Sequence, residues 1–140
     1  MQKAGSKVET DLRIVEYRAY YFSLRFNFKG DDETEYARVK ELVGDNKEYG
    51  GDHGVPTPLK LKISVIEPAG ERVIVDKVVS DLRLWSWGAD HFFKHIDYIK
   101  LKPGIYRVSV ESLQDAPELI GTPTALRIYY DQNSTTLPIN

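Results

Sequence analysis

The residues best suited to chemistry are concentrated in one short segment, WSWGADHFFKH, at residues 85–95. It contains both tryptophans, Trp85 and Trp87, and two of the three histidines, His91 and His95. The two histidines are four residues apart, so on a helix both imidazoles would project from one face, as paired metal ligands often do. A metal site is therefore the first chemistry to weigh for this segment.

The third histidine, His53, follows Asp52 in a stretch rich in Gly and Pro, DNKEYGGDHGVPTP, which predicts a long loop that could close over the other two histidines. Two imidazoles supply only half of a tetrahedral zinc site, and no glutamate follows His91 to act as a metalloprotease base. The absence of cysteine excludes zinc–thiolate sites, iron–sulfur clusters and disulfides. We therefore predict no metal and no cofactor, and keep Asp52, His53, His91 and His95 as candidate binding residues.

Trp85 and Trp87 are two residues apart and would share one face of a strand. Two interpretations follow: at least one ring lies in the core, or both form an exposed shelf for a sugar or a protein partner. Because aromatic rings dominate the energetics of cores, we expect a core role. The whole segment is then a structural corner, in which Gly88 ends a strand and a helical turn from Asp90 carries the histidines at its rim.

Known catalytic patterns are missing. The serines lack the strand-to-helix context of a nucleophile elbow, and Ser86, although near His91, lies between the tryptophans. No glycine-rich phosphate-binding loop follows a predicted strand. We therefore predict that the protein is not an enzyme.

The net charge of the chain argues against two classes of binding partner. A net charge of −2 and an isoelectric point near 5.9 provide no basic field for nucleic acid or an anionic membrane. No apolar run reaches the roughly 18 residues of a transmembrane helix, and the polar start MQKAGSKVET lacks the apolar core of a signal peptide.

Most of the chain reads as short strands. In YYFSLRFNF, apolar residues alternate with polar ones, which is typical of a half-buried strand, and similar alternation recurs to residue 130. One helix is predicted over 33–43, where Asp32 can cap its start and Gly44 its end. Seven or eight strands and one helix predict an all-β antiparallel sandwich, with an up-and-down barrel as the alternative.

The predicted organisation is a flexible segment at 1–7, a single sandwich domain at 8–132 and a tail at 133–140. The tail is either loosely held or paired at a sheet edge. Alternation places the following residues in the core: Phe22, Leu24, Phe26, Leu61, Ile63, Val108, Val110 and Ile128.

The segment LKPGIYRVSVES resembles the strand entry of immunoglobulin-like and prealbumin-like sandwiches, in which the tyrosine, here Tyr106, packs back over the corner. The order of motifs from about Val8 to Ile128 is similar to domain-of-unknown-function family 5625, a family of small bacterial envelope proteins. That resemblance implies an immunoglobulin-like fold, export to the periplasm or outer membrane, and often a lipid anchor on the precursor. It implies no catalytic residues.

The expected function is a noncatalytic binding or protein-interaction module of the bacterial cell envelope, acting as a monomer with an unknown protein partner. Two alternatives stay open. One is an immunity protein that neutralises a toxin delivered to the periplasm. The other is a metal- or carbohydrate-binding protein that uses residues 85–95.

Overall fold

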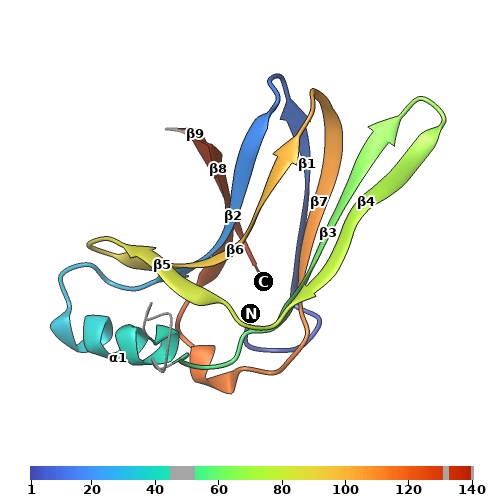
Figure 1. Cartoon of the computed structure of the whole chain (residues 1–140). Coiled ribbons are helices and arrows are strands. Elements are labelled where there is room, and N and C mark those ends of the chain that lie inside the picture. The colour runs from blue at the N-terminus through green and yellow to red at the C-terminus, as the bar shows by residue number, and fades with distance from the viewer. Residues whose placement is uncertain (45–52, 131–132, 140) are drawn as a thin grey trace.

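Two antiparallel sheets pack face to face in the computed structural model, which describes residues 1–44, 53–130 and 133–139 (Figure 1). The four-stranded sheet has the order β1 (Lys7–Ile14), β7 (Gly104–Ser112), β3 (Leu59–Glu67) and β4 (Gly70–Val79). The five-stranded sheet has the order β5 (Arg83–Trp87), β6 (His91–Leu101), β2 (Arg18–Asn27), β8 (Thr124–Tyr130) and β9 (Asn133–Pro138). No described strand is paired across the two sheets, so the fold is a sandwich and not a closed barrel.

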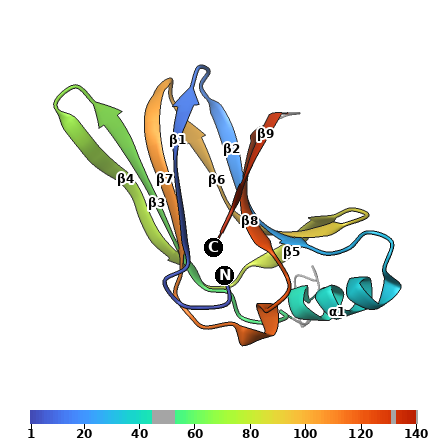
Figure 2. The same ribbon diagram turned by 180° about the vertical axis from the view of Figure 1, so that it is seen from behind.

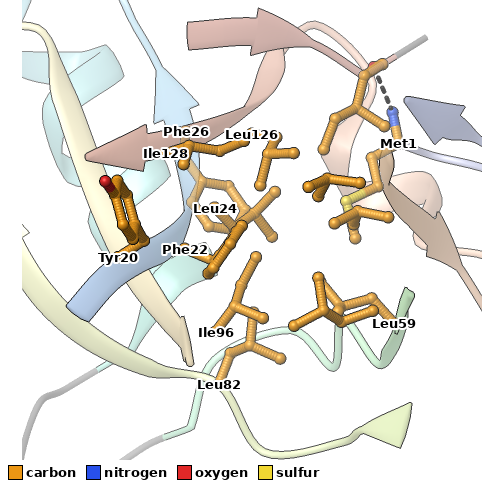
Figure 3. Close-up of a cluster of buried hydrophobic side chains, with 14 of the residues drawn as sticks. Met1, Tyr20, Phe22, Leu24, Phe26, Leu59, Leu82, Ile96, Leu126 and Ile128 are labelled. Atoms are coloured by element: carbon orange, nitrogen blue, oxygen red, sulfur yellow. Dashed lines mark hydrogen bonds between the residues drawn. The ribbon is translucent and has the colours of Figure 1, made fainter. Parts of the chain in front are cut away.

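The predicted core is confirmed. All eight residues expected there are at most 3% exposed, and they come from β2, β3, β7 and β8. Figure 3 shows Phe22, Leu24 and Phe26 of β2 in one cluster with Leu59 and Leu126. The alternation read from β2 holds because one side of this central strand faces the opposite sheet while the other side faces outward.

Two of the connections between the sheets, β1–β2 and β6–β7, lie at the same end of the sandwich (Figures 1 and 2). After each crossing a buried tyrosine fixes the corner. The Tyr20 hydroxyl donates to the carbonyl oxygen of Glu16 at 3.1 Å, and the Tyr106 hydroxyl donates to that of Lys102 at 2.7 Å. The corner role predicted for Tyr106 is confirmed, and Tyr20 repeats it.

Both ends of the chain pack on the domain. The described residues form nine strands, against the seven or eight expected. The tail forms β9 and pairs with β8 at the sheet edge, which is one of the two arrangements predicted for it. At the other end, the expected flexible segment begins with a Met1 side chain that is 8% exposed. Figure 3 shows the Met1 amine donating to the Ile139 carbonyl oxygen at 3.5 Å. Sequence patterning misses the contact of the N-terminal segment because that segment is short and polar.

Among the described residues there is one α-helix, α1 (Glu33–Val43), and it has the predicted bounds. Asp32 accepts hydrogen bonds from the backbone N–H groups of Thr34 and Glu35, and Gly44 follows the last turn with a positive φ of 76°. Val39 and Val43 are fully buried. The helix thus closes one end of the sandwich beside β5 and β6 (Figure 1). None of the described helices is both long and apolar enough to span a membrane.

Replacing Asp32 with alanine is expected to lower the free energy of unfolding by about 1 kcal/mol, since the carboxylate satisfies two of the helix's unpaired N–H donors. Urea denaturation of the variant and the wild type measures this difference. Asp31→Ala is the matched control, because Asp31 is exposed one residue outside the cap. Equal losses for the two variants would contradict the capping role.

Candidate interaction face

Residues 85–95 form a β-hairpin and not a helical corner. β5 pairs with β6, and the Gly88 N–H donates to the carbonyl oxygen of His91 at 3.0 Å across the turn. The predicted helical turn from Asp90 is therefore wrong. The sequence HFFKHI hides a strand because Phe92 and Phe93 point to opposite sides of the sheet and both are buried.

The two tryptophans do not form a shared shelf, nor does either belong to the core. They are 51% and 58% exposed, so the expected core role is wrong. A bulge between Leu84 and Ser86 interrupts β5. It lets Trp85 stack on His95, with ring centroids 4.8 Å apart, while Trp87 pairs with Phe92 on the other side of the sheet.

His91 and His95 occupy the same side, but of strand β6 and not of the predicted helical turn, and the Phe93 side chain lies between them. The His91 ring packs on Phe93 with a centroid separation of 4.8 Å, and its Nδ1 lies 2.6 Å from Asp90 Oδ1. This hydrogen bond, and then the charges of His91 and Arg25, hold the pKa of Asp90 below its ordinary value. Each histidine therefore has its own local partner, and the pair does not converge on a common point.

His53 lies apart from the other two histidines. Its Nδ1 is 2.7 Å from Asp81 Oδ1, and its carbonyl oxygen accepts a hydrogen bond from Lys94 Nζ at 2.9 Å. Lys94 is 2% exposed and pairs with Leu24 on the inner side of the sheet, opposite to the side of His95. Asp52 lies outside the described residues. Among the residues that are described, no three His, Asp or Glu side chains gather where a metal ion could bind.

The outer side of the five-stranded sheet brings together a different set of residues. We call it the aromatic face, and it comprises Tyr21, Arg25, Trp85, Phe93, His95, Tyr98, Arg127 and Tyr129. Sequence analysis selected only Trp85 and His95 from this set. For the other residues, the available sequence signal was the outward-facing set of alternating residues in β2 and β8. That set looks like an ordinary solvent-facing pattern until the strand order is known.

Contacts across neighbouring strands make the aromatic face continuous. Tyr21 lies between Tyr129, at 5.2 Å with an interplanar angle of 21°, and Tyr98, at 5.8 Å. The Arg127 guanidinium lies 4.2 Å from the Tyr129 centroid and 4.6 Å from that of Phe93. These cation–π and stacking contacts hold the side chains in fixed positions, which lowers the entropic cost of binding a partner.

The strands place charged side chains of only one sign on this outer side of the sheet. The charged side chains at outward positions of the described strands are all cationic, namely Arg25, Arg83, Lys100 and Arg127. Asp90 lies in the hairpin turn, where it is 3.6 Å from Arg25. Arg127 forms no ion pair with any described residue, so its charge is left for a partner. The face is thus positive in a protein whose net charge is −2.

The His95 imidazole makes stability at this face depend on pH. Burial lowers the pKa of His95 below its ordinary value of 6.5, Asp97 opposes this effect, and Lys77 adds to it. The unfolded chain therefore binds the proton more tightly than the folded one. The contribution of His95 to stability is complete above pH 6.5 and is lost as the pH falls through the folded-state pKa.

We expect His95→Gln to flatten the loss of unfolding free energy between roughly pH 7 and pH 5, because the glutamine cannot take up a proton there. Urea denaturation at several pH values measures the slope. Tyr98→Ala on the same face removes no group that titrates in this range, and should leave the slope as in the wild type. An unchanged slope in His95→Gln would show that burial of this ring is not the cause.

Comparison with known proteins supports the fold and the family. Nothing among curated proteins matches the chain. The crystal structure of a protein from Sulfurospirillum deleyianum is similar, with a TM-score of 0.77 and 22% sequence identity over 94% of each chain. That likeness shows a shared fold. The sequence profile of DUF5625, described as a domain of unknown function, matches residues 1–130, and the chain therefore belongs to this family.

Proposed function

We propose that this protein is a noncatalytic interaction module of the bacterial cell envelope that binds an acidic partner protein through the aromatic face. The observation that carries the proposal is the exposure of Trp85 and Tyr98, at 51% and 56%, on a sheet face whose strand charges are all cationic. Rings of this size are costly to leave in water unless a partner covers them.

The composition of the face supports a protein ligand. Interface cores are enriched in Tyr, Trp, Phe and Arg and depleted in Asp and Glu, and the aromatic face consists of the first group together with His95. Tyr, Trp and Arg are also the residues that most often dominate binding energy. The outer side of a five-stranded sheet presents them as an open surface, which suits a folded partner.

The ring geometry favours a protein over a sugar. Sugars stack on open ring faces, but Tyr21 and Tyr129 are nearly parallel and cover each other at 5.2 Å. Trp85 likewise has His95 stacked at 4.8 Å. The tyrosines therefore present ring edges and hydroxyl groups outward, which can donate to carbonyl and carboxylate oxygens of a protein surface.

Charge defines the partner further. With Arg25 and Arg127 held against the Phe93 ring, at 5.6 and 4.6 Å from its centroid, an approaching acidic patch meets two guanidinium groups in fixed positions. Arginine binds carboxylates in a bidentate geometry, so these groups would set the orientation of the partner. Location in the periplasm or at the outer membrane, and a lipid anchor on the precursor, follow from the properties that the family resemblance implies.

Photo-crosslinking tests the proposal directly. A photoreactive phenylalanine at position 98 should crosslink to one protein in an envelope extract of the source organism. Arg127→Glu should reduce the yield about tenfold, because it places a carboxylate against the acidic patch. Raising the salt concentration should lower the yield as well.

The opposite sheet provides matched controls. Ile105, which is 48% exposed on β7, takes the photoreactive residue in place of position 98, and Arg107→Glu on the same strand replaces Arg127→Glu. The photoreactive residue at position 105 should give no crosslink to the partner, and Arg107→Glu should not lower the yield of the crosslink from position 98. Crosslinks of equal yield from both sheets, or a yield at position 98 that Arg127→Glu leaves unchanged, would refute the proposal. If soluble glycans bound to the aromatic face and no protein adduct formed, carbohydrate binding would replace protein binding as the proposed role of this face.

A further inference from the structure

β4 is the least covered strand of the sandwich. It is a ten-residue edge strand with β3 on one side and no described strand on the other. Its side chains are exposed on both faces, including three apolar, β-branched residues, Val73 at 49%, Ile74 at 39% and Val78 at 61%. A long edge of this kind, with free N–H and C=O groups, is a template for an added strand.

A groove runs along this free edge, between β4 and β6. Pairing of β5 with β6 stops at His95, so the β6 edge from Asp97 to Leu101 has no described neighbour on that side. Two cavities lie along the opening. One of about 590 Å³ lies between Ile74–Lys77 and Asp97–Ile99, and one of about 270 Å³ continues past Ile74 toward Arg72 and Lys102. We call the two together the β4 groove.

A bulge shapes the groove. The register of β4 against β3 shifts between Ile63 and Ser64, so Ile74 is inserted between Val73 and Val75. Val75 pairs with Ile63 on the core side, and Ile74 lines both cavities, so consecutive side chains point toward the groove. The bulge thus replaces strict alternation with an apolar floor beneath the free edge.

Charge differs along the groove. In its middle, Lys77 of β4 forms an ion pair with Asp97 of β6 across the opening. At one end, Arg72 and Lys102 line the smaller cavity with no acidic residue among its lining. Arg72 is held by Glu67 at 2.6 Å on the exposed turn of the hairpin, and Lys102 forms no ion pair with any residue that the structure describes. This end therefore favours a ligand that carries carboxylates.

A second copy of this chain is a poor occupant. Two copies could pair antiparallel through their β4 edges. Because of the bulge, every two residues that face each other lie on the same side of the sheet in only one register, in which Ile74 faces Val75 of the copy. That register places Arg72 directly opposite Lys77 of the copy, twice by symmetry. Like charges in directly opposed positions destabilise strand pairing, so the edge disfavours its own sequence.

We propose that the β4 groove binds an extended, acidic segment of another protein, which adds to the free edge of β4 as a further strand. Main-chain hydrogen bonds to β4 supply the affinity, an apolar side chain of the segment lies on Ile74, and its carboxylates meet Arg72 and Lys102. The β4 groove meets the aromatic face at Tyr98, which lines the larger cavity, but the free edge, Ile74 and Arg72 belong to the other sheet.

A synthetic peptide that repeats Thr-Val-Thr-Glu, capped at both ends, is the probe, because Val and Glu then follow each other on one face of the strand, as Ile74 and Arg72 do on β4. Titration into the labelled protein should give saturable amide shifts confined to β4 and to β6 after His95, together with slower hydrogen exchange along β4. Ile74→Glu and the double variant Arg72→Glu/Lys102→Glu should each weaken binding about tenfold or more. The same peptide with Lys in place of Glu should not bind.

The other edge of the same sheet supplies the control. Lys7 and Arg13 are exposed on β1, and their double reversal to Glu should leave the affinity unchanged. Amide spectra with wild-type dispersion establish that each variant is folded. Lack of saturation up to ~1 mM peptide, equal binding of the Lys peptide, or shifts centred on β1 or on the aromatic face would each overturn the proposal.

Discussion

Replacing Phe26 with alanine is expected to lower the free energy of unfolding by about 3–5 kcal/mol, the usual cost of a large cavity in a core. Phe26 is 1% exposed and lies on the central strand of the five-stranded sheet, paired with Phe92 on one side and Thr124 on the other. The Lys94 ammonium lies 6.0 Å from its ring centroid. The change thus removes both packing and a cation–π contact from a buried lysine.

Urea denaturation followed by circular dichroism gives the difference in unfolding free energy. Tyr98→Ala is the matched control, because Tyr98 is also an aromatic residue of this sheet but is 56% exposed. Its loss should cost roughly 1 kcal/mol or less. If Phe26→Ala cost no more than Tyr98→Ala, the inward side of β2 would be misassigned.

Replacing Gly54 with alanine is expected to cost about 4 kcal/mol or more, because two penalties add. Gly54 has a φ of 71°, which favours glycine, and a Cβ there would lie 2.6 Å from the Val43 carbonyl carbon and 2.8 Å from the Gly44 nitrogen. These are backbone atoms at the end of α1, so no side chain can turn aside. The neighbouring Val55 N–H donates to the Leu42 carbonyl oxygen at 2.8 Å, and this docking would be lost.

Gly121→Ala separates the two penalties. Gly121 has a similar φ of 81° but nothing within 4 Å of an added Cβ, so it should show the backbone penalty alone, about 1–2 kcal/mol. Thermal and urea unfolding of both variants measure the comparison. Losses of equal size would mean that the contact between residue 54 and the end of α1 carries no energy.

The strands and the helix were predictable where one physical signal dominated. In β2 the alternation of apolar and polar residues is complete, so its inward residues follow from sequence alone. Pairing with β8 is regular, and the register shift against β6 after Phe22 comes from an extra residue on β6. The bounds of α1 follow from Asp32 and Gly44, since capping groups act locally and need no knowledge of the fold.

The hairpin at 85–95 was not predictable because its strands are covered or occupied on both sides. Phe92 packs inward against Phe28 and Tyr36, and Phe93 packs outward beneath Arg25 and Arg127, so no alternation is left to read. The bulge at Trp85 then reverses the expected side of every later residue of β5.

The aromatic face lies beyond single-sequence reasoning for a different reason. Tyr21, Tyr98 and Tyr129 come from three strands widely separated in the sequence, and only the order β6–β2–β8 makes them neighbours. The charges show the same limit. Arg25 and Arg127 are two of 19 basic residues until the sheet places them around one ring.

The position of β2 also governs how fast the chain can fold. Phe22 pairs with Asp97 on one side and with Ile128 on the other, so neither partner of this central strand is near it in sequence. The chain must close long loops, at an entropic cost, before these strands can pair. Folding is therefore expected in the millisecond-to-second range typical of β-sandwiches. During synthesis β2 leaves the ribosome long before β8 does, so the apolar side of β2 stays exposed to solvent while most of the chain is made. Exposed apolar surface and unpaired strand edges during that interval are prone to aggregation.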